Sequence, residues 1–278
     1  RGSALSMTSL QLVSRWRGED LGQPIPNERH AVSVCLPRWR DNVGYEEGDP
    51  AVTGAMRAGY PRFFFHPDTA DLFATIERML AQPGKCAMAF PSEKVAWRCA
   101  EFIYRETGSQ TEIGSMCSGQ IHFVLMPIAA RDTAKAYWQH AGEIVPSRMA
   151  VALLESRKAV DGTREKQLLR ERVAALQGSS AEDVYLFPSG MAAVFTAYRL
   201  LQRLRPEARS IQFGFPYVDN LKVQQRLSRV RPVEQACSFF PRGTEADIDE
   251  VARLAANEKL LGLFVELPGN PLLGSPNV

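Results

Sequence analysis

Three residues at the start of a predicted helix could bind an anion. The stretch VYLFPSGMAAV places Ser189, Gly190 and Met191 where an apolar predicted strand passes directly into a helix. The first amides of a helix have no partner within the helix and lie at the positive end of its dipole, which favours a phosphate. A tight packing turn that needs Gly190 would explain the same residues, so PSGM alone leaves both interpretations open.

Two later strand ends carry an aromatic and an amide side chain. Tyr217 follows the predicted strand that ends in FGFP, and Asn270 follows the one that ends in VELPG. In an open parallel sheet, ligands bind outside the carboxyl ends of the strands, so we expect both residues to face the crevice of Gly190. Tyr217 could stack on a flat heterocycle or only pack on its helix. Asn270 could bond to a ligand oxygen or only shape a turn.

The elements that would position these residues follow an α/β pattern. From about residue 84, short apolar runs alternate with helical spacing, which predicts a mostly parallel sheet. The predicted strands are 86–90, 120–126, 184–187, 210–215, 232–239 and 261–267. Helices are predicted after Ser189, from Thr163 to Gly178, and from Thr244, which has the residue type of an N-cap. The proline-rich first 60 residues show little periodicity and predict an extended arm.

Composition limits the function classes. A formal net charge of +2 gives no reason to expect nucleic acid or an acidic membrane as a partner. No apolar run reaches the roughly 18 residues of a membrane span, so we expect no membrane partner. The five cysteines include no CxxC pair, and no metal site is predicted. This cysteine usage leads us to expect a reducing, cytoplasmic location. Residues 1–9, RGSALSMTS, are similar to the remnant of an expression tag, with Met7 near the native start.

The sequence contains one internal echo. The segments FPSEKVA at 90–96 and FPSGMAA at 187–193 both follow a predicted strand and open a predicted helix. A decayed duplication would explain this, and so would the shared requirements of any strand-turn-helix unit.

Three segments together resemble a known family. VYLFPSGMAAV, FGFPYVDNLKVQQRL and LFVELPGNPLLGSPNV, in this order, are similar to the cofactor domain of the pyridoxal 5'-phosphate enzymes of cysteine and methionine metabolism, closest to the cystathionine gamma-synthase branch. HAVSVCLPRW, GYPRFFFHP and AYWQHAGEIVPSR resemble the long N-terminal region of the fungal type. The resemblance covers roughly residues 28–278 and implies the three-layer large domain of a type I pyridoxal phosphate transferase.

The resemblance also implies a domain organisation. Residues 10–83 would form the extended N-terminal arm, and residues 84–145 an α/β region that contains the first copy of the echo. Residues 146–278 would form the front half of the cofactor-binding large domain.

The resemblance assigns roles to individual residues. The amides of Gly190 and Met191, with Ser189 beside them, would hold the cofactor phosphate. Tyr217 would stack on the pyridine ring and act as a catalytic residue in proton movement. Asn270 would lie near the 3-hydroxyl of the cofactor.

One role in this family has two candidate residues in the sequence, and two further roles have none. The family sends a Tyr-x-Arg segment to the phosphate in the neighbouring subunit, which implies Arg148, although Pro146 stands where the family has tyrosine. Arg62, in Tyr60-Pro61-Arg62, is the rival. The family also needs an Asp at the pyridine nitrogen and a Schiff-base lysine, for which no residue up to Val278 has the right context. We therefore expect a chain truncated before that lysine, with the C-terminal part absent.

The implied activity is that of cystathionine gamma-synthase, the replacement of the acyl group of an O-acylhomoserine by cysteine, in a cytoplasmic homodimer or homotetramer. The parent protein would be an enzyme, whereas the activity of the 278-residue chain alone stays open. The alternatives are an O-acetylhomoserine sulfhydrylase, a methionine gamma-lyase, or a non-catalytic subunit or fragment that keeps a cofactor-like crevice.

Overall fold

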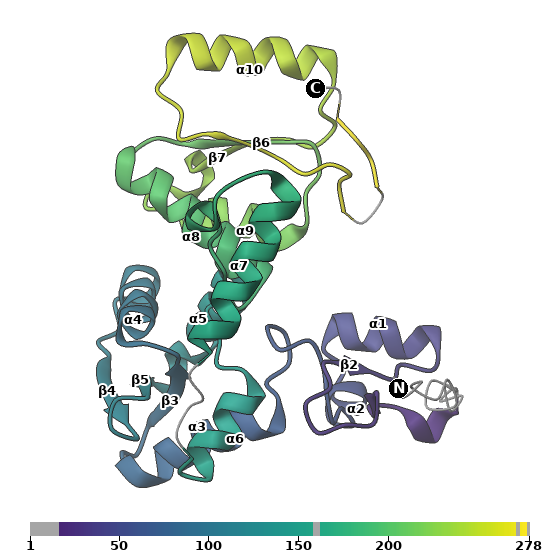
Figure 1. Cartoon of the computed structure of the whole chain (residues 1–278), viewed down its shortest axis with the longest axis vertical. Coiled ribbons are helices and arrows are strands. Elements are labelled where there is room, and N and C mark those ends of the chain that lie inside the picture. The colour runs from purple at the N-terminus through teal and green to yellow at the C-terminus, as the bar shows by residue number, and fades with distance from the viewer. Residues whose placement is uncertain (1–16, 158–161, 271–272, 277–278) are drawn as a thin grey trace.

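The computed structural model describes residues 17–157, 162–270 and 273–276. The residues expected to be a tag remnant lie outside these ranges. The described chain is a mixed α/β protein with three separate small sheets. Figure 1 shows an elongated molecule, in which one α/β part lies at the top, another lies at the lower left, and the N-terminal elements lie to the right. No described helix combines the length and the apolar character needed to cross a membrane.

The N-terminal elements are short. The segment contains the 3-10 helix η2 (Gly18–Asp20), the antiparallel pair β1 (Pro24–Ile25) and β2 (Ser33–Val34), and the helices α1 (Trp39–Glu47) and α2 (Pro50–Thr53). Asp49 caps α2 by accepting a hydrogen bond from the amide of Ala51, and Pro50 occupies the first helical position, where its missing amide costs nothing. Both helices lie within residues 10–83, the segment predicted to form an extended arm. Their local caps explain how such a proline-rich segment forms helices.

The lower α/β part contains an antiparallel sheet. Its strands β3 (Lys85–Phe90), β4 (Glu112–Met116) and β5 (Ile121–Pro127) have the order β3-β5-β4. Two of them agree with predicted strands, but the prediction of parallel β/α pairing is wrong here. Strands β4 and β5 are joined by a four-residue turn at 117–120, which is too short for the crossover that parallel strands need.

Helices surround this sheet and bury a large aromatic core. They are α3 (Pro67–Leu80), α4 (Glu93–Thr107), the 3-10 helix η3 (Ile128–Ala130), α5 (Arg131–Ala141) and α6 (Ser147–Leu154). Trp138 of α5 lies edge-on to Phe73 of α3 at 5.6 Å, and Tyr137 lies edge-on to Phe195 at 6.0 Å. Because Phe195 belongs to the upper part of the molecule, α5 contributes to both cores.

The upper part contains the parallel sheet. Strands β6 (Ser210–Phe213), β7 (Cys237–Phe240) and β8 (Leu263–Val265) have the order β7-β6-β8. Helices α8 (Gly190–Leu204) and α9 (Val218–Arg226) lie on one side of this sheet and α10 (Glu245–Asn257) on the other (Figure 1). All three strands overlap predicted ones. Strand β7 ends one residue after the predicted strand 232–239, whose first half forms the 3-10 helix η5 (Val233–Gln235).

The predicted strand Val184–Phe187 is absent, which is a correction. The 3-10 helix η4 (Ala181–Asp183) comes first, and the apolar run after it is exposed, with Tyr185 at 76 %. None of the described strands pairs with it. An apolar run becomes a strand only beside a neighbour that takes its backbone hydrogen bonds.

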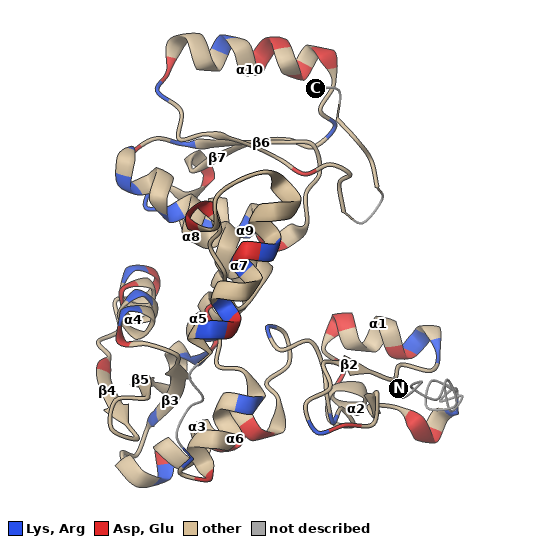
Figure 2. Ribbon diagram, in the orientation of Figure 1, with Lys and Arg blue, Asp and Glu red and all other residues tan. Residues whose placement is uncertain are grey.

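The predicted helices are confirmed. Thr244 caps α10 and forms a capping box with Asp247, and acidic residues occupy the first turn of that helix, where the dipole favours them (Figure 2). Helix α7 (Thr163–Gln177) ends at Gly178, which has φ +63°. Its large apolar side chains are nevertheless exposed, with Leu176 at 84 %, and Ala174 is its one buried residue, so the helical spacing identified the helix but not a broad buried face.

The two copies of the echo have the same local structure. Ser92 caps α4 with φ −158° and ψ 158°, and Ser189 caps α8 with φ −151° and ψ 158°. Each hydroxyl accepts a hydrogen bond from the third residue of its helix, Val95 or Ala192. The shared Phe-Pro-Ser is therefore a helix-start motif, and its origin by duplication remains a prediction.

Candidate functional site

The amino end of α8 leaves two backbone amides open. Within the described parts of the chain, neither Gly190 nor Met191 donates its amide hydrogen to an acceptor. A Cβ added at Gly190 would meet no atom within 4 Å, so the space beside Gly190 is open. With the positive end of the α8 dipole behind them, the amides can receive an anion.

Ser189 is occupied by the fold itself. Its hydroxyl donates to the carbonyl oxygen of Gly142 at 2.9 Å and accepts from the amide of Ala192 at 3.1 Å. A hydroxyl has a single hydrogen to donate. Ser189 therefore fixes the start of α8 and ties it to the end of α5, whereas Gly190 and Met191 provide the open donors.

Gly142 was not identified from the sequence, and its role depends on close packing. It ends α5 with φ +66°. A Cβ at this position would lie 2.6 Å from Ser189 Oγ and 2.7 Å from Met191 Cβ. Only glycine allows this approach, so the carboxyl end of α5 holds the turn that contains the open amides. The one available signal was a glycine just after a helical pattern.

Tyr217 is held at the amino end of α9 by two contacts. Its backbone amide donates to Glu266 Oε2 at 3.0 Å, and the Asn220 side-chain amide donates to the same oxygen at 2.7 Å. Because Glu266 follows β8, these bonds join the carboxyl end of that strand to the start of α9. At the other end of the side chain, the phenol oxygen accepts a 2.6 Å hydrogen bond from Arg62 Nη2.

Arg62 lies in a buried polar cluster beneath Tyr217. Its side chain is 2 % exposed and forms an ion pair with Asp219. Arg62 Nη1, the nitrogen that contacts Asp219, also donates to the carbonyl oxygen of Gln139 at 2.6 Å. On the other side, His140 Nδ1 lies 2.9 Å from Asp219 Oδ1. Burial acts to raise the pKa of Asp219, but the hydrogen bonds from His140 and Arg62 outweigh it and leave that pKa lowered. In this cluster, the buried carboxylate of Asp219 and the buried guanidinium of Arg62 thus neutralise each other's charge.

Tyr217 also lines a cavity of about 890 Å³. Tyr60 and Phe63 line it from the segment before α3, Gln139 from α5, and Tyr45 and Glu46 from α1. Its size is that of a small-molecule site, and its walls combine aromatic rings with a few polar groups. The N-terminal segment therefore closes one side of the space in front of Tyr217.

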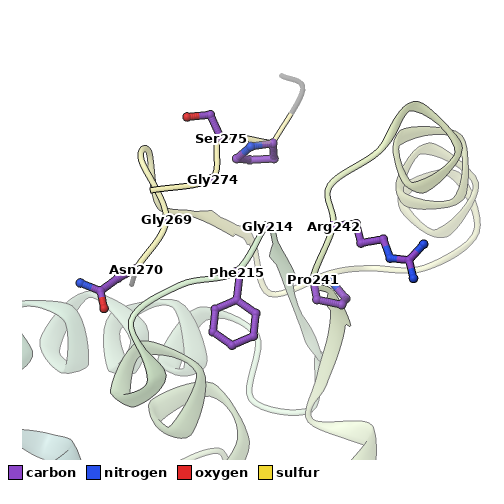
Figure 3. Close-up of a pocket in the computed structure, with 9 residues that line it drawn as sticks. Gly214, Phe215, Pro241, Arg242, Gly269, Asn270, Gly274 and Ser275 are labelled. Carbon is purple, nitrogen blue, oxygen red and sulfur yellow. The ribbon is translucent and has the colours of Figure 1, made fainter. Parts of the chain in front are cut away.

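Asn270 lines a different hollow, shown in Figure 3. This hollow has a volume of about 550 Å³ and includes Gly214, Phe215 and Arg242. The Gly269 amide donates to the carbonyl oxygen of Gly274 at 2.7 Å, which closes the loop that carries Asn270. In Figure 3, Asn270 and Arg242 lie on opposite sides of Phe215.

The structure thus brings the predicted site residues together only in part. The last turn of α5 contacts both helix starts, through Gly142 to Ser189 and through His140 to Asp219. Tyr217 and Asn270 line two separate cavities, and Gly190 lines neither of them.

The two arginine candidates lie in different surroundings. Arg148 is exposed in the first turn of α6, next to Ser147, whose hydroxyl lies 3.0 Å from His30 Nδ1. Burial and the nearby Arg148 charge lower the pKa of His30. Arg62, in contrast, directs both terminal nitrogens to protein groups. Of these two arginines, Arg148 is the one without a hydrogen bond or ion pair to another described residue.

One cluster has the residue types of a metal site. His30, His66 and Asp68 place ligand atoms within 4.8 Å of one another. The Arg29 guanidinium donates a hydrogen bond to each Asp68 carboxylate oxygen, at 3.0 and 2.7 Å. His66 Nε2 is hydrogen-bonded to the Arg29 carbonyl oxygen at 2.6 Å. These groups have partners within the protein, so the cluster is an internal hydrogen-bond network.

Comparison with known proteins gives a consistent picture. Residues 68–146 match the model of the fungal trans-sulfuration enzyme, N-terminal domain. The chain is 29% identical to the cystathionine gamma-synthase-like enzyme iboG2 of Amanita muscaria, over 100% of this chain and 60% of that protein. It is 26% identical to cystathionine gamma-synthase of Saccharomyces cerevisiae and 29% identical to that of Neurospora crassa. These matches cover 94% and 93% of this chain and 62% of each relative.

The chain thus spans about 60% of the length of these curated relatives. No solved structure matches it. The family model and the relatives cover, between them, the N-terminal region and both helix starts described above. Residues 68–146 thus match the N-terminal domain of the fungal trans-sulfuration enzyme family, and nearly the whole chain is similar to cystathionine gamma-synthase and its relatives.

Proposed function

We propose that this chain holds the phosphate and ring of pyridoxal 5'-phosphate in a cystathionine gamma-synthase-like transferase. The whole protein would replace the acyl group of an O-acylhomoserine by the thiol of cysteine and so form cystathionine. The observation that carries the proposal is the pair of open amides, Gly190 and Met191, at the amino end of α8. The names of the relatives in yeast and Neurospora support the reaction class.

The residues present fit the phosphate. Two adjacent amides and a helix dipole suit a dianion, and the open space at Gly190 admits it. Ser189 supports this site indirectly, because its hydrogen is already donated to Gly142. Arg148 makes no hydrogen bond or ion pair with another described residue, which supports a role toward the phosphate of a second subunit in a homodimer or homotetramer.

Tyr217 and Asn270 complete the proposed site. The Tyr217 ring is half-buried and would stack on the pyridine ring, while its hydroxyl exchanges protons with the substrate. Asn270 is exposed at the loop after β8 and would bond to the 3-hydroxyl. When bound, the cofactor supplies an electron sink for proton removal from the amino acid. The protein binds, orients and moves protons.

An assay on the protein translated from the complete reading frame tests the reaction. It is supplied with pyridoxal 5'-phosphate and offered an O-acylhomoserine with either cysteine or sulfide, and methionine in a separate reaction. Cystathionine as the main product supports the proposal. Homocysteine from sulfide, or cleavage of methionine, would instead indicate a sulfhydrylase or a gamma-lyase. Binding of the cofactor without any turnover would indicate a non-catalytic subunit.

A further inference from the structure

We propose that Arg62 is a positioning residue for Tyr217, which directs the phenol hydrogen toward the cavity and stabilises the phenolate left when that hydrogen is transferred. The proposal deepens the proposed function, because it assumes that Tyr217 exchanges a proton with a bound substrate. In that step the phenol O–H bond breaks, the proton passes to a substrate atom in the cavity, and the negative charge stays on the phenol oxygen beside Arg62.

Hydrogen-bond chemistry determines the direction of the phenol hydrogen. A guanidinium has only donors, so the 2.6 Å contact makes the Tyr217 oxygen an acceptor from Arg62 Nη2. The single phenol hydrogen must therefore point away from Arg62. Tyr217 lines the cavity of about 890 Å³, so that space receives the hydrogen.

The surroundings of Arg62 restrict its movement. The guanidinium carbon lies 5.1 Å from the Tyr60 ring centre, 5.0 Å from that of Phe63 and 5.5 Å from that of Tyr217. Asp219 and the Gln139 carbonyl hold Nη1, and Nε is the one buried side-chain polar atom among the described residues without a hydrogen-bond partner. A charge held in this way loses little freedom when a phenolate forms beside it.

Two opposite charges act on the phenol. Burial raises the pKa of Tyr217, the Arg62 charge opposes this, and Asp219 adds to it. The other titratable groups on the phenol side and around the cavity are Tyr45, Tyr60, Lys135, Glu46 and Glu47. Behind Asp219 lies His140, and Glu266 bonds to the Tyr217 amide. Removing Arg62 and removing Asp219 should therefore move the Tyr217 titration in opposite directions.

A difference titration on the 278-residue chain, without cofactor, tests this. Tyrosinate absorbance is followed with pH for the parent and for Tyr217→Phe, and their difference isolates one of the seven tyrosines. The same pair is measured with Arg62→Gln and with Asp219→Asn. We expect an upward shift of the Tyr217 midpoint for Arg62→Gln and a downward shift for Asp219→Asn. Arg253→Gln, which changes an exposed arginine on α10, should leave the midpoint unchanged.

Both single variants leave a buried charge without its partner, so the double variant Arg62→Gln, Asp219→Asn provides the second measurement. Without either charge, its Tyr217 midpoint should still lie above that of the parent, because the guanidinium donor is gone. Equal midpoints in the parent and the double variant, or shifts of the same sign in both single variants, would overturn the proposal. Since no cofactor is present, this outcome is independent of whether the chain binds pyridoxal 5'-phosphate.

Discussion

Arg62 and Tyr217 lie 155 residues apart in the sequence and are joined by a hydrogen bond of 2.6 Å between Nη2 and the phenol oxygen. Through this bond, the segment before α3 enters the surroundings of a residue that follows the central strand of the parallel sheet. The N-terminal region therefore belongs to the candidate site and does not only cover an edge of the core.

The buried pair of Arg62 and Asp219 should dominate local stability. Asp219→Asn leaves the guanidinium without its counter-charge, and removing one partner of a buried ion pair costs about 3–5 kcal/mol. Urea unfolding of the variant and the parent measures this difference. Glu250→Gln, which breaks the exposed pair with Arg253, is the matched control and should change little. A variant at Asp219 as stable as the parent would contradict the described cluster.

Stability should fall in acid through the same carboxylate. The pKa of Asp219 is lowered in the folded protein, so its contribution is present above the unfolded value of about 4 and is lost as the pH falls through the folded value. Melting temperatures measured on lowering the pH from 7 should drop below pH of about 4. The curve for Asp219→Asn should be flatter there, and identical slopes for both proteins would refute this assignment.

Substitutions at two helix-ending glycines allow the effect of backbone strain to be distinguished from that of close packing. Gly142 and Gly178 both end helices with positive φ, but a Cβ meets neighbouring atoms only at Gly142. Gly178→Ala should lower the free energy of unfolding by about 1 kcal/mol through strain alone. Gly142→Ala should add an overpacking cost of about 1–3 kcal/mol and displace the turn at Ser189. Equal losses in the two variants would show that α5 does not press against that turn.

The two serine caps form a second matched pair. Ser92→Ala and Ser189→Ala should each cost about 1 kcal/mol in thermal or urea unfolding, because each removes an N-cap. Only Ser189→Ala should also weaken binding of pyridoxal 5'-phosphate, because it loosens the turn that carries the open amides. Loss of binding in Ser92→Ala to the same extent would place the phosphate elsewhere.

Local signals allowed the helices to be predicted from the sequence. Thr244 with Asp247 marks the start of α10, and Ser189 marks the start of α8. Helix caps and capping boxes can be recognised in the sequence because their residues are only three positions apart. The strands of the parallel sheet were recognisable as apolar runs. Val184–Phe187 has the same composition but no neighbour among the described strands, and pairing depends on distant parts of the chain that composition does not reveal.

The candidate site was predictable to the same extent. Tyr217 and Gly190 were found because they begin helices after apolar segments. Their partners were not, since Arg62 reaches Tyr217 across 155 residues and Gly142 reaches Ser189 across 47. Such contacts depend on how α5 packs between the two helix starts. Gly142 carries no local pattern that distinguishes it from an ordinary helix end. The pattern Tyr60-Pro61-Arg62 made Arg62 a candidate for the phosphate but gave no sign of its contact with Tyr217.

The central claim is that the amides of Gly190 and Met191 hold the phosphate of pyridoxal 5'-phosphate. Its most direct measurement is calorimetric titration of the 278-residue chain with pyridoxal 5'-phosphate and, in parallel, with pyridoxal, which lacks the phosphate. Charge-assisted hydrogen bonds contribute about 1.5–3 kcal/mol each, so the phosphate compound should bind at least about tenfold more tightly, and inorganic phosphate should compete with it. Equal affinity for the two compounds, or no binding of either, would contradict the claim.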